Sequence, residues 1–377
     1  MNEENLPLFQ PYVFNNGVTI KNRLVVAPLT IYDSGSNGEL TASARRFWQN
    51  RFAGFGTFIM PFTNVDPSGI GFESPDAFND NQLPTLREYV KIAHGQGAKI
   101  IMQLGHAGYK ARPDMTRGFQ VVAPDGTVRR RAHTLNEGQI QRLITAFANA
   151  TRLGILAGMD GVEIQGANGW LVEQFFSPAT NHRLDHWGGS FEKRLNFLMA
   201  IIDAVDQVRQ RYHRPDFIIG YRFSPERPRD GFSMRDSFAL IDALVQKPLQ
   251  YLHVSLLNFY SRPRRGASRQ RTRMQLFHQR LAGKLPLIGV GSLYTGKQIR
   301  EAYQTGWAEF IALGRAVMLN PELIQLIQTG HDEAIETTFD WRHADRYRYT
   351  PAMLQAKREN LDLAYRTPHR LKGRSLR

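Results

Sequence analysis

Cysteine is absent from this sequence of 377 residues. The chain therefore has no disulfide, no thiolate zinc site, no iron–sulfur cluster and no cysteine nucleophile. It also lacks any uncharged apolar run of about 18 residues, so no segment is predicted to span a membrane. The acidic N-terminal residues lead into no apolar stretch, which argues against a secretory signal, and we expect the protein in the cytoplasm.

Acidic residues are fewer than basic ones, 34 against 48, which gives a formal net charge of +14. Six arginines fall within residues 262–273, and residues 366–377 carry four arginines and one lysine. Basic runs of this kind are typical of solvated loops and tails. No nucleic-acid-binding motif with interleaved aromatic residues accompanies either run, so we do not expect nucleic acid as a partner.

Short apolar segments rich in β-branched residues alternate with helical patterns along the chain. Eight of them are predicted strands, at residues 24–27, 57–60, 99–104, 161–165, 217–223, 251–255, 286–290 and 310–313. Near-continuous apolar strands that alternate with helices indicate a parallel sheet covered on both faces. Eight such units favour an α/β fold with a single (β/α)₈ TIM barrel over two doubly wound domains.

The intervening segments have helical periodicity at residues 83–94, 191–211 and 295–304. A further helix is predicted to run to about residue 156, with Thr134 and Glu137 as a capping box at its start. Residues 105–133 form an excursion after the third strand, in which Asp125-Gly126 suggests a small hairpin. We place the barrel at residues 1–335 and a helical, basic C-terminal extension at residues 336–377.

The active site of a barrel of this kind lies at the C-terminal ends of its strands. The residues expected there are Pro28, Thr30, Phe62, Thr63, Gln103, Gln165, Asn168, Arg222, Ser255, Gly291, Gly314 and Arg315. The set holds one interior guanidinium, several amides and hydroxyls, but no carboxylate pair and no histidine cluster. It suits a planar heterocycle whose edges need hydrogen bonds, and it does not suit metal-assisted hydrolysis or glycoside cleavage.

The last two units have the features of a phosphate site. Gly291-Ser292 follows the seventh strand and leads into a helix near Thr295, so backbone N–H groups and the helix dipole can face an anion. Gly314-Arg315 follows the eighth strand and adds bare backbone with a fixed positive charge. Loops after strands 7 and 8 are a common phosphate site in barrel enzymes.

Several motifs resemble those of the old yellow enzyme family, FMN-dependent ene-reductases, over about residues 9–323. The matching runs are Ala27-Pro28-Leu29-Thr30, Gln103-Leu-Gly-His-Ala-Gly108, Gln165-Gly-Ala-Asn168-Gly169, Glu173-Gln174-Phe-Phe-Ser177-Pro178, Asn181-His-Arg183-Leu-Asp185, Gly188-Gly-Ser190 and Glu192-Lys-Arg194. Together these motifs are highly specific. The resemblance implies FMN as cofactor and NADH or NADPH as reductant.

The resemblance also implies roles for individual residues. Thr30 would contact the flavin near O4 and N5, and Gln103 would bind its pyrimidine edge. Arg222 would stabilise negative charge at N1 and O2 of the reduced flavin, as a cation there favours the state that gives up hydride. The phosphate would be held by Gly291, Ser292, Gly314 and Arg315, while Pro28 and Phe62 would supply backbone and packing around the ring.

Two positions depart from the family pattern. A His-Asn or His-His pair usually grips the carbonyl oxygen of the acceptor, whereas this chain has Gln165 and Asn168, and a glutamine cannot become cationic. A tyrosine usually follows two residues later as proton donor, whereas this chain has Trp170, whose indole N–H is not a useful acid. Tyr32 is the nearest alternative phenol, and an ordinary place in the pocket wall is its other interpretation.

Three histidines also need an interpretation. His182 and His186 are four residues apart, as in a helical metal pair, but their segment is loop-like and no third ligand is apparent. We therefore predict a polar network through Arg183, Asp185, Glu192 and Arg194. His106 follows the third strand and is either a proton donor or a hydrogen-bonded part of the loop.

The sequence is thus interpreted as an FMN-dependent oxidoreductase that passes hydride from NAD(P)H to an electron-poor small molecule, such as an activated alkene. The segment 262–273 lies on the active-site face and is a candidate for binding the extra phosphate of NADPH. The alternatives are another FMN-barrel oxidoreductase, or a catalytically weakened flavin-binding or sensing protein. A homo-oligomer is compatible with the sequence, and no metal is expected.

Overall fold

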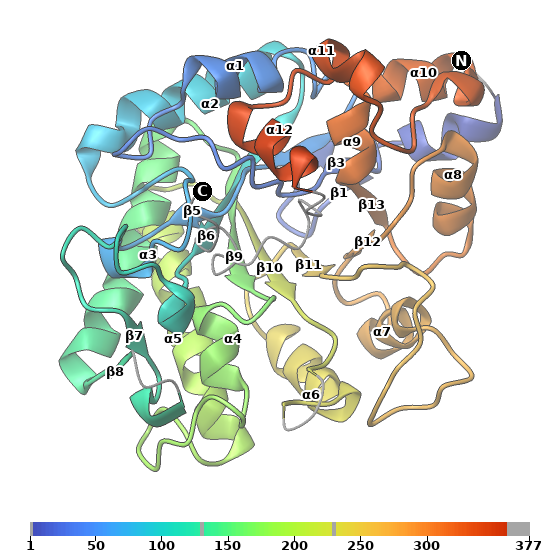
Figure 1. The fold of residues 1–377 in the computed structure, drawn as a ribbon. Helices are drawn as coiled ribbons and strands as arrows, with labels where there is room; N and C mark the ends of the chain where they lie inside the picture. The colour runs from blue at the N-terminus through green and yellow to red at the C-terminus, as the bar shows by residue number, and fades with distance from the viewer. Residues whose placement is uncertain (1–2, 129–131, 228–230, 360–377) are drawn as a thin grey trace.

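A computed structural model describes residues 3–128, 132–227 and 231–359 and confirms the (β/α)₈ barrel. Eight parallel strands form the centre and helices surround them (Figure 1). All eight predicted strands are present, with ends that differ by at most a few residues. The barrel strands are β3 (Leu24–Val26), β4 (Thr57–Ile59), β6 (Lys99–Gly105), β9 (Gly161–Gly166), β10 (Ile218–Phe223), β11 (Tyr251–Val254), β12 (Leu287–Val290) and β13 (Phe310–Leu313).

The sheet closes on itself because the first strand pairs with the last. Ile311 of β13 is in register with Leu24 of β3, and Thr57 of β4 with Lys99 of β6. The short strand β5 (Thr63–Asn64) pairs in parallel with the C-terminal end of β6. All of these pairings are parallel, so the C-terminal ends of the strands open on one face, as the barrel prediction requires.

The helices form the outer ring, and their buried faces pack against the apolar outer side of the strands. Three predicted helices are confirmed closely, as α2, α5 and α8. The α-helices are α1 (Ala42–Trp48), α2 (Leu83–Gly95), α3 (Glu137–Ala157), α4 (Leu171–Phe176), α5 (Phe191–Arg211), α6 (Met234–Leu244), α7 (Arg273–Leu281), α8 (Gly296–Gln304), α9 (Arg315–Leu319), α10 (Leu323–Thr329), α11 (Ala344–Tyr347) and α12 (Pro351–Arg358).

The predicted cap of α3 was wrong by two residues. Asn136 is the N-cap, and it forms a reciprocal capping box with Gln139. Thr134 instead belongs to the short strand β8 (His133–Thr134). Asparagine caps a helix as well as serine or threonine does, and a capping box needs only Glu or Gln three residues later, so the sequence offered two overlapping solutions.

The excursion after β6 is present, but the hairpin predicted at Asp125-Gly126 is wrong. Strand β7 (Val122–Ala123) pairs with β8 in parallel rather than antiparallel. The Asp125 carboxylate accepts hydrogen bonds from the backbone N–H and the hydroxyl of Thr127, at 2.9 and 2.7 Å. These bonds stabilise a 3₁₀ turn over Gly126–Val128 in place of a two-residue hairpin loop.

The N-terminal end of the barrel is closed by an antiparallel pair, β1 (Tyr12–Val13) and β2 (Thr19–Ile20). Aromatic rings connect this pair to the barrel interior, with Tyr12 and Phe310 centroids 5.1 Å apart. The core inside the barrel, which extends to the β1–β2 pair, consists of Phe14, Ile20, Val25, Ala27, Ile59, Ile101, Ile218, Tyr251, Ile288, Phe310 and Ala312. The apolar filling at this end leaves polar chemistry to the opposite one.

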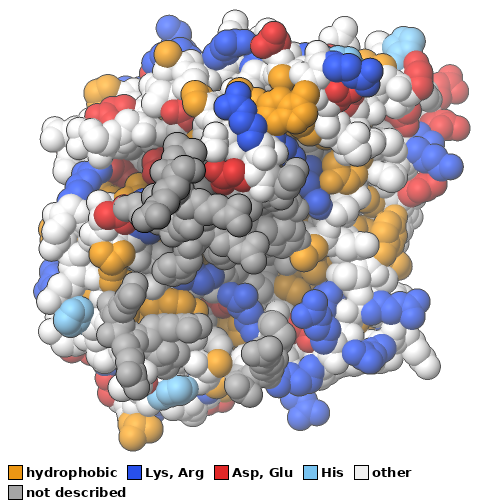
Figure 2. All heavy atoms as spheres, viewed as in Figure 1, with side chains coloured by type: hydrophobic (Ala, Val, Ile, Leu, Met, Phe, Trp, Pro, Cys, Tyr) orange, Lys and Arg blue, Asp and Glu red, His pale blue; other side chains and the backbone are white. Residues whose placement is uncertain are grey.

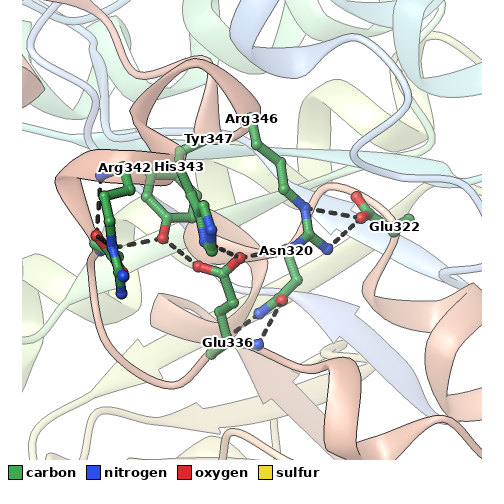
Figure 3. Close-up of polar contacts among 8 residues, drawn as sticks. Asn320, Glu322, Glu336, Arg342, His343, Arg346 and Tyr347 are labelled. Carbon is green, nitrogen blue, oxygen red and sulfur yellow. Dashed lines mark hydrogen bonds and ion pairs between the residues drawn. The ribbon is translucent and has the colours of Figure 1, made fainter.

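The described part of the C-terminal extension packs on the barrel beside α1, α9 and α10 (Figure 1). Figure 3 shows the polar contacts that hold it, which centre on Glu336. This carboxylate accepts hydrogen bonds from Arg346 at 2.7 Å and from the Tyr347 hydroxyl, while Asn320 exchanges two hydrogen bonds of 2.9 Å with its backbone. Thr350 donates to the carbonyl oxygen of Ile31 at 2.9 Å, which connects the extension to the loop after β3.

A fully buried arginine completes this connection. Arg51 donates to the carbonyl oxygens of Phe47, Val317, Met318 and Tyr347, which belong to α1, α9 and α11. Burial lowers its pKa to about 9. The guanidinium is held by oriented carbonyl dipoles, and it fixes the C-terminal end of α9 against the extension.

No helix within residues 3–128, 132–227 and 231–359 has both the length and the apolar character to cross a membrane. The basic segment 366–377 lies outside the described residues.

Candidate active site

A cavity of about 1060 Å³ opens at the C-terminal ends of the strands. Thr63, expected at the strand ends, does not line it, because its side chain is buried and its hydroxyl donates to Pro61 O at 3.0 Å. The thirteen residues to which the sequence assigned a role all line the cavity. They are Pro28, Thr30, Tyr32, Phe62, Gln103, Gln165, Asn168, Trp170, Arg222, Gly291, Ser292, Gly314 and Arg315. The structure therefore brings together side chains from seven barrel strands and the loops that follow them.

The floor of the cavity is a chain of amide groups whose directions are set by a buried carboxylate. Glu163 lies on β9 and is fully buried. The Gln103 amide nitrogen donates to Glu163 Oε1 at 2.6 Å, and the Gln165 amide nitrogen donates to Gln103 Oε1 at 3.3 Å. Ala167 N–H donates to Gln165 Oε1 at 3.1 Å. An ionised carboxylate accepts hydrogen bonds only, so both glutamine amides are orientated by it.

Glu163 stays ionised in this interior. Burial raises its pKa, but His253, Arg222 and the Gln103 amide together outweigh burial, and the pKa of Glu163 is lowered. Burial lowers the pKa of His253, and its Nδ1 lies 2.9 Å from Glu163 Oε2. His253 Nε2 is buried and has no hydrogen-bond partner in the described ranges.

The sequence interpretation missed Glu163 and His253. Their signal was present, since each is a polar residue inside an otherwise apolar strand at an inward-facing position. Register brings them together, because Glu163 is opposite Gln103 and Arg222 is opposite both Gln165 and His253. A search for polar residues in equivalent layers of neighbouring strands finds this group.

Arg222 is an interior cation and not part of a surface ion pair. Burial lowers its pKa, and the charge of Glu163 opposes that effect. Its Nη2 donates to Ser255 Oγ at 3.3 Å, and this hydroxyl donates to Asn168 Oδ1 at 3.1 Å. Arg222 Nε is buried and forms no hydrogen bond with any described residue. An orphaned donor at the cavity floor is the kind of group that a ring nitrogen or carbonyl of a flavin satisfies.

The end of β9 and the turn after it place two side-chain amides, those of Gln165 and Asn168, in the cavity lining. Asn168 has φ +60° and Gly169 has φ +73°, so the chain turns sharply before α4 begins. Because Ser255 occupies Asn168 Oδ1, the amide nitrogen of Asn168 is left facing the cavity, and it makes no hydrogen bond within the described part of the chain. Gln165 keeps one N–H besides the one bound to Gln103. Both groups donate, as binding a carbonyl oxygen requires.

One wall of the cavity is aromatic. The Trp170 ring lies 5.2 Å from Phe62 and 5.6 Å from Phe72, centroid to centroid, and Tyr32 lies 5.7 Å from Phe72. Trp170 is therefore packed into the wall where the family pattern places a phenol. Tyr32 has φ +51°, an unusual conformation for a tyrosine, which the adjacent Ile31–Thr350 hydrogen bond helps to hold.

The opposite end of the cavity has the predicted phosphate residues. Arg315, the first residue of α9, donates to Ser292 Oγ at 2.6 Å, and its guanidinium lies 5.6 Å from the centre of the Tyr294 ring. Ser292 has φ +53°, and its hydroxyl donates to Leu257 O at 2.6 Å. These contacts bring the loops after β12 and β13 together beside the N-terminal ends of α8 and α9, where backbone N–H groups favour an anion.

The arginine-rich segment 262–273 lies over the same face. Glu226 holds it in place by accepting hydrogen bonds from the backbone N–H groups of Arg264 and Arg265, at 2.8 and 3.0 Å. Arg273 is buried and paired with Glu226 at 2.6 Å, so this arginine is not the solvated residue that the basic run suggested. Figure 2 shows Lys and Arg side chains gathered at the lower right of this face, over α6 and α7.

None of the three histidines considered in the sequence lines the cavity. His106 does not line the cavity, and its Nδ1 accepts from Gly108 N–H at 3.0 Å while Nε2 lies 3.0 Å from Ser68 Oγ. Burial lowers the pKa of His106 to about 4, which leaves it neutral. His182 and His186 contact Asp125 and Asn196, and no group of three metal-ligating side chains occurs among the described residues.

Of the predicted polar network, the Arg183–Asp185 pair is present, while Glu192 accepts from Ser190 and Arg194 donates to backbone carbonyl oxygens. Arg183 pairs with Asp185 and donates to the carbonyl oxygens of Pro124 and Leu135, at 2.8 and 2.6 Å. Arg194 donates to Phe176 O at 2.9 Å. The network braces the loop between α4 and α5 against the excursion after β6.

Comparison with known proteins decides the family. The model of the NADH:flavin oxidoreductase / NADH oxidase family matches residues 7–333. The chain belongs to this family. It is therefore an NAD(P)H-dependent flavin oxidoreductase with FMN as cofactor, which confirms the resemblance to old yellow enzyme.

Individual relatives agree. A probable NADH-dependent flavin oxidoreductase of Bacillus subtilis, YqiG, is 37% identical, with 94% of this chain and 97% of that protein covered. An NADH:acrylate oxidoreductase of Vibrio harveyi is 32% identical over 83% of this chain, but the match covers only 32% of that longer protein. The solved structure of morphinone reductase shares the fold, with a TM-score of 0.73 and 23% identity over 86% of this chain and 89% of that one.

Proposed function

We propose that this family member reduces an activated, electron-poor alkene, and that Gln165 and Asn168 bind the carbonyl oxygen which activates it. The observation that carries the proposal is the pair of amide donors at the cavity floor. Their direction is imposed by Glu163 through Gln103 on one side and by Arg222 through Ser255 on the other. Pre-orientated donors stabilise negative charge that develops on an oxygen during reduction.

The remaining lining residues fit FMN between this floor and the phosphate end. Bound FMN supplies hydride transfer at N5 between the nicotinamide and the acceptor. Thr30 and Gln103 would bind the ring edge, Pro28 and Phe62 would pack on it, and Arg222 would offer its orphaned Nε to the pyrimidine side. The phosphate would be held by Gly291, Ser292, Gly314 and Arg315.

Turnover of the purified FMN-loaded protein tests this function. With NADH or NADPH and 2-cyclohexenone under nitrogen, we expect consumption of the alkene beyond a control without enzyme. Asn168→Leu should lower kcat/KM for the enone about tenfold, because a hydrogen bond to a developing oxyanion is lost, while bleaching of the yellow colour by the nicotinamide is unchanged. A flavin that is reduced but is reoxidised by no activated alkene would contradict the proposal.

Replacement of Arg222 by methionine tests the proposed contact of Arg222 with the pyrimidine side of the flavin. The variant keeps an unbranched, apolar side chain at this position but removes the positive charge of Arg222 from the cavity lining. We expect the flavin to be reduced by NADH more slowly, by roughly tenfold or more, since positive charge beside the developing anion is lost. Stopped-flow bleaching measures this rate, and an unchanged rate in a folded variant would show that Arg222 acts elsewhere.

A further inference from the structure

Two cationic side chains meet at one point on the rim of the cavity. A Cβ atom placed on Gly169 would lie 1.9 Å from Arg227 Nη2 and 2.8 Å from Lys110 Nζ. The two nitrogens are therefore only a few ångström apart, directly above the turn that carries Asn168 and Trp170. Because both groups are positively charged, a carboxylate placed between them would be attracted by both at once.

Arg227 is held there by a built support. Glu173 is buried, and its Oε1 accepts from Arg227 Nε while its Oε2 accepts from the Ser224 hydroxyl. Arg227 N–H donates to Phe232 O at 2.9 Å, which fixes the backbone as well. Because the carboxylate takes the Nε side, the terminal nitrogens of the guanidinium point to the rim, where Arg227 lines the cavity and Glu173 does not.

Lys110 reaches the same point from the excursion after β6. Its Nζ donates to the carbonyl oxygen of Asn168 at 2.7 Å and lies 4.8 Å from the centre of the Trp170 ring. The ammonium thus contacts the backbone of Asn168, the residue whose side-chain amide is proposed to bind the carbonyl oxygen. Gly169 has φ +73°, a conformation that favours glycine, and a Cβ atom there would displace the ends of both cationic side chains.

Charge in the cavity is unbalanced toward the positive. The described lining contains Lys110, Arg222, Arg227, Arg264, Arg273 and Arg315 but a single carboxylate, Glu226. That carboxylate accepts hydrogen bonds from Arg273 and from the backbone N–H groups of Arg264 and Arg265. A cavity with this balance concentrates anions and disfavours cations.

We propose that Lys110 and Arg227 bind a carboxylate on the acceptor, so that the protein prefers unsaturated carboxylates to neutral enones. The inference rests on the proposed function, since it assigns the acceptor to the Gln165 and Asn168 side of the cavity. A phosphate of the nicotinamide nucleotide has similar chemistry, but the pair adjoins Asn168 and Trp170 and belongs to the acceptor side. The aromatic wall adds a preference for a flat or conjugated substituent beside the carboxylate.

A binding measurement on the FMN-loaded protein tests the site without turnover. Benzoate and benzamide have the same shape and differ in charge, and neither is an activated alkene. Titration of each into the oxidised protein, followed by the change in the flavin absorption bands, should give at least tenfold tighter binding for benzoate. Equal affinities for the two probes in the parent protein would overturn the inference.

Lys110→Gln is the informative variant, because loss of Arg227 would leave the buried Glu173 without its cation and endanger folding. We expect benzoate to bind about tenfold more weakly in Lys110→Gln and benzamide to bind as in the parent. Lys110→Arg should restore the preference for benzoate. Lys297→Gln, an exposed change on α8, is the matched loss of one positive charge and should alter neither affinity.

Measuring flavin reduction and flavin reoxidation separately distinguishes a carboxylate on the acceptor from a phosphate on the nicotinamide nucleotide. In Lys110→Gln, reoxidation of the reduced protein by cinnamate should slow about tenfold, whereas reoxidation by cinnamamide and reduction by NADH or NADPH should not. A variant that slows reduction by the nucleotide alone would assign the pair to the nucleotide phosphate and overturn the inference. If neither cinnamate nor cinnamamide is reduced while benzoate still binds selectively, the alkene function fails and the anion site stands.

Discussion

Replacing Arg315 by alanine is expected to weaken FMN binding by roughly ten- to a hundredfold. A charge-assisted hydrogen bond to a phosphate is worth about 1.5–3 kcal/mol, and Arg315 is the cation at the end of the cavity where the loops after β12 and β13 meet. Titration of the apoprotein with FMN, followed by quenching of flavin fluorescence, gives the dissociation constant directly.

Riboflavin provides the decisive control because it lacks the phosphate. Arg315→Ala should leave riboflavin affinity near that of the parent, so the FMN-to-riboflavin preference collapses. Arg315→Lys should fall between the two proteins, since it keeps the charge but loses the planar fork. Arg280→Ala, an exposed arginine on α7, should change nothing. Equal losses for FMN and riboflavin in Arg315→Ala would indicate a distorted loop instead of a lost phosphate contact.

The fold was predictable because barrel strands have a signal that depends on local composition. A strand such as β13, Phe310–Leu313, is buried on both sides and must be apolar throughout, and its neighbours follow the same rule. The number of such segments then selects the closed barrel. Once the barrel is assumed, the C-terminal strand ends identify the cavity, and all thirteen selected residues line it.

Features set by contacts distant in sequence were not predictable in the same way. Lys110 and Arg227 are far apart in the chain, and only the folded turn at Gly169 brings their charges together. From the sequence, Arg51 would be taken for an exposed residue just after a surface helix. In the structure it donates to four carbonyl oxygens from three elements. Neither case has a local pattern that separates it from an ordinary solvated cation.

Local signals also competed with each other. Thr134 and Asn136 were both acceptable helix caps, and the choice depends on Thr134 being drawn into β8. Asp125-Gly126 fits a hairpin turn, but the Asp125 side chain instead organises the 3₁₀ turn that follows. Such alternatives differ by about 1 kcal/mol or less, and tertiary pairing decides between them.

The source of the proton in alkene reduction is the point on which this chain departs most from the family pattern. His106 is removed from consideration by its place outside the cavity and by burial, which lowers its pKa to about 4. The Trp170 indole is held in the aromatic wall between Phe62 and Phe72. The phenols that line the cavity in the described ranges are Tyr32, Tyr109 and Tyr294.

Trp170→Tyr should therefore accelerate the reduction of a simple cyclic enone. A positioned general acid contributes about 10²–10⁴-fold, which sets the upper limit of the gain. Reduction of the flavin by NADH should be nearly unaffected, because that step needs no acid at position 170. Stopped-flow reoxidation of the reduced protein by 2-cyclohexenone measures the first rate, and anaerobic bleaching by NADH measures the second.

Trp170→Phe distinguishes proton donation by the new hydroxyl from the steric effect of a smaller side chain. Phenylalanine has the shape of tyrosine without the hydroxyl, and either ring removes part of the indole that contacts Phe62 and lies beneath Lys110. If the hydroxyl acts as an acid, Trp170→Tyr is fast and Trp170→Phe stays slow. Equal enone rates in the two variants would show that Trp170 is a steric gate. A parent protein that already reduces cyclohexenone as fast as it oxidises NADH would have another acid, and Tyr32→Phe would then be the variant in which that rate should fall.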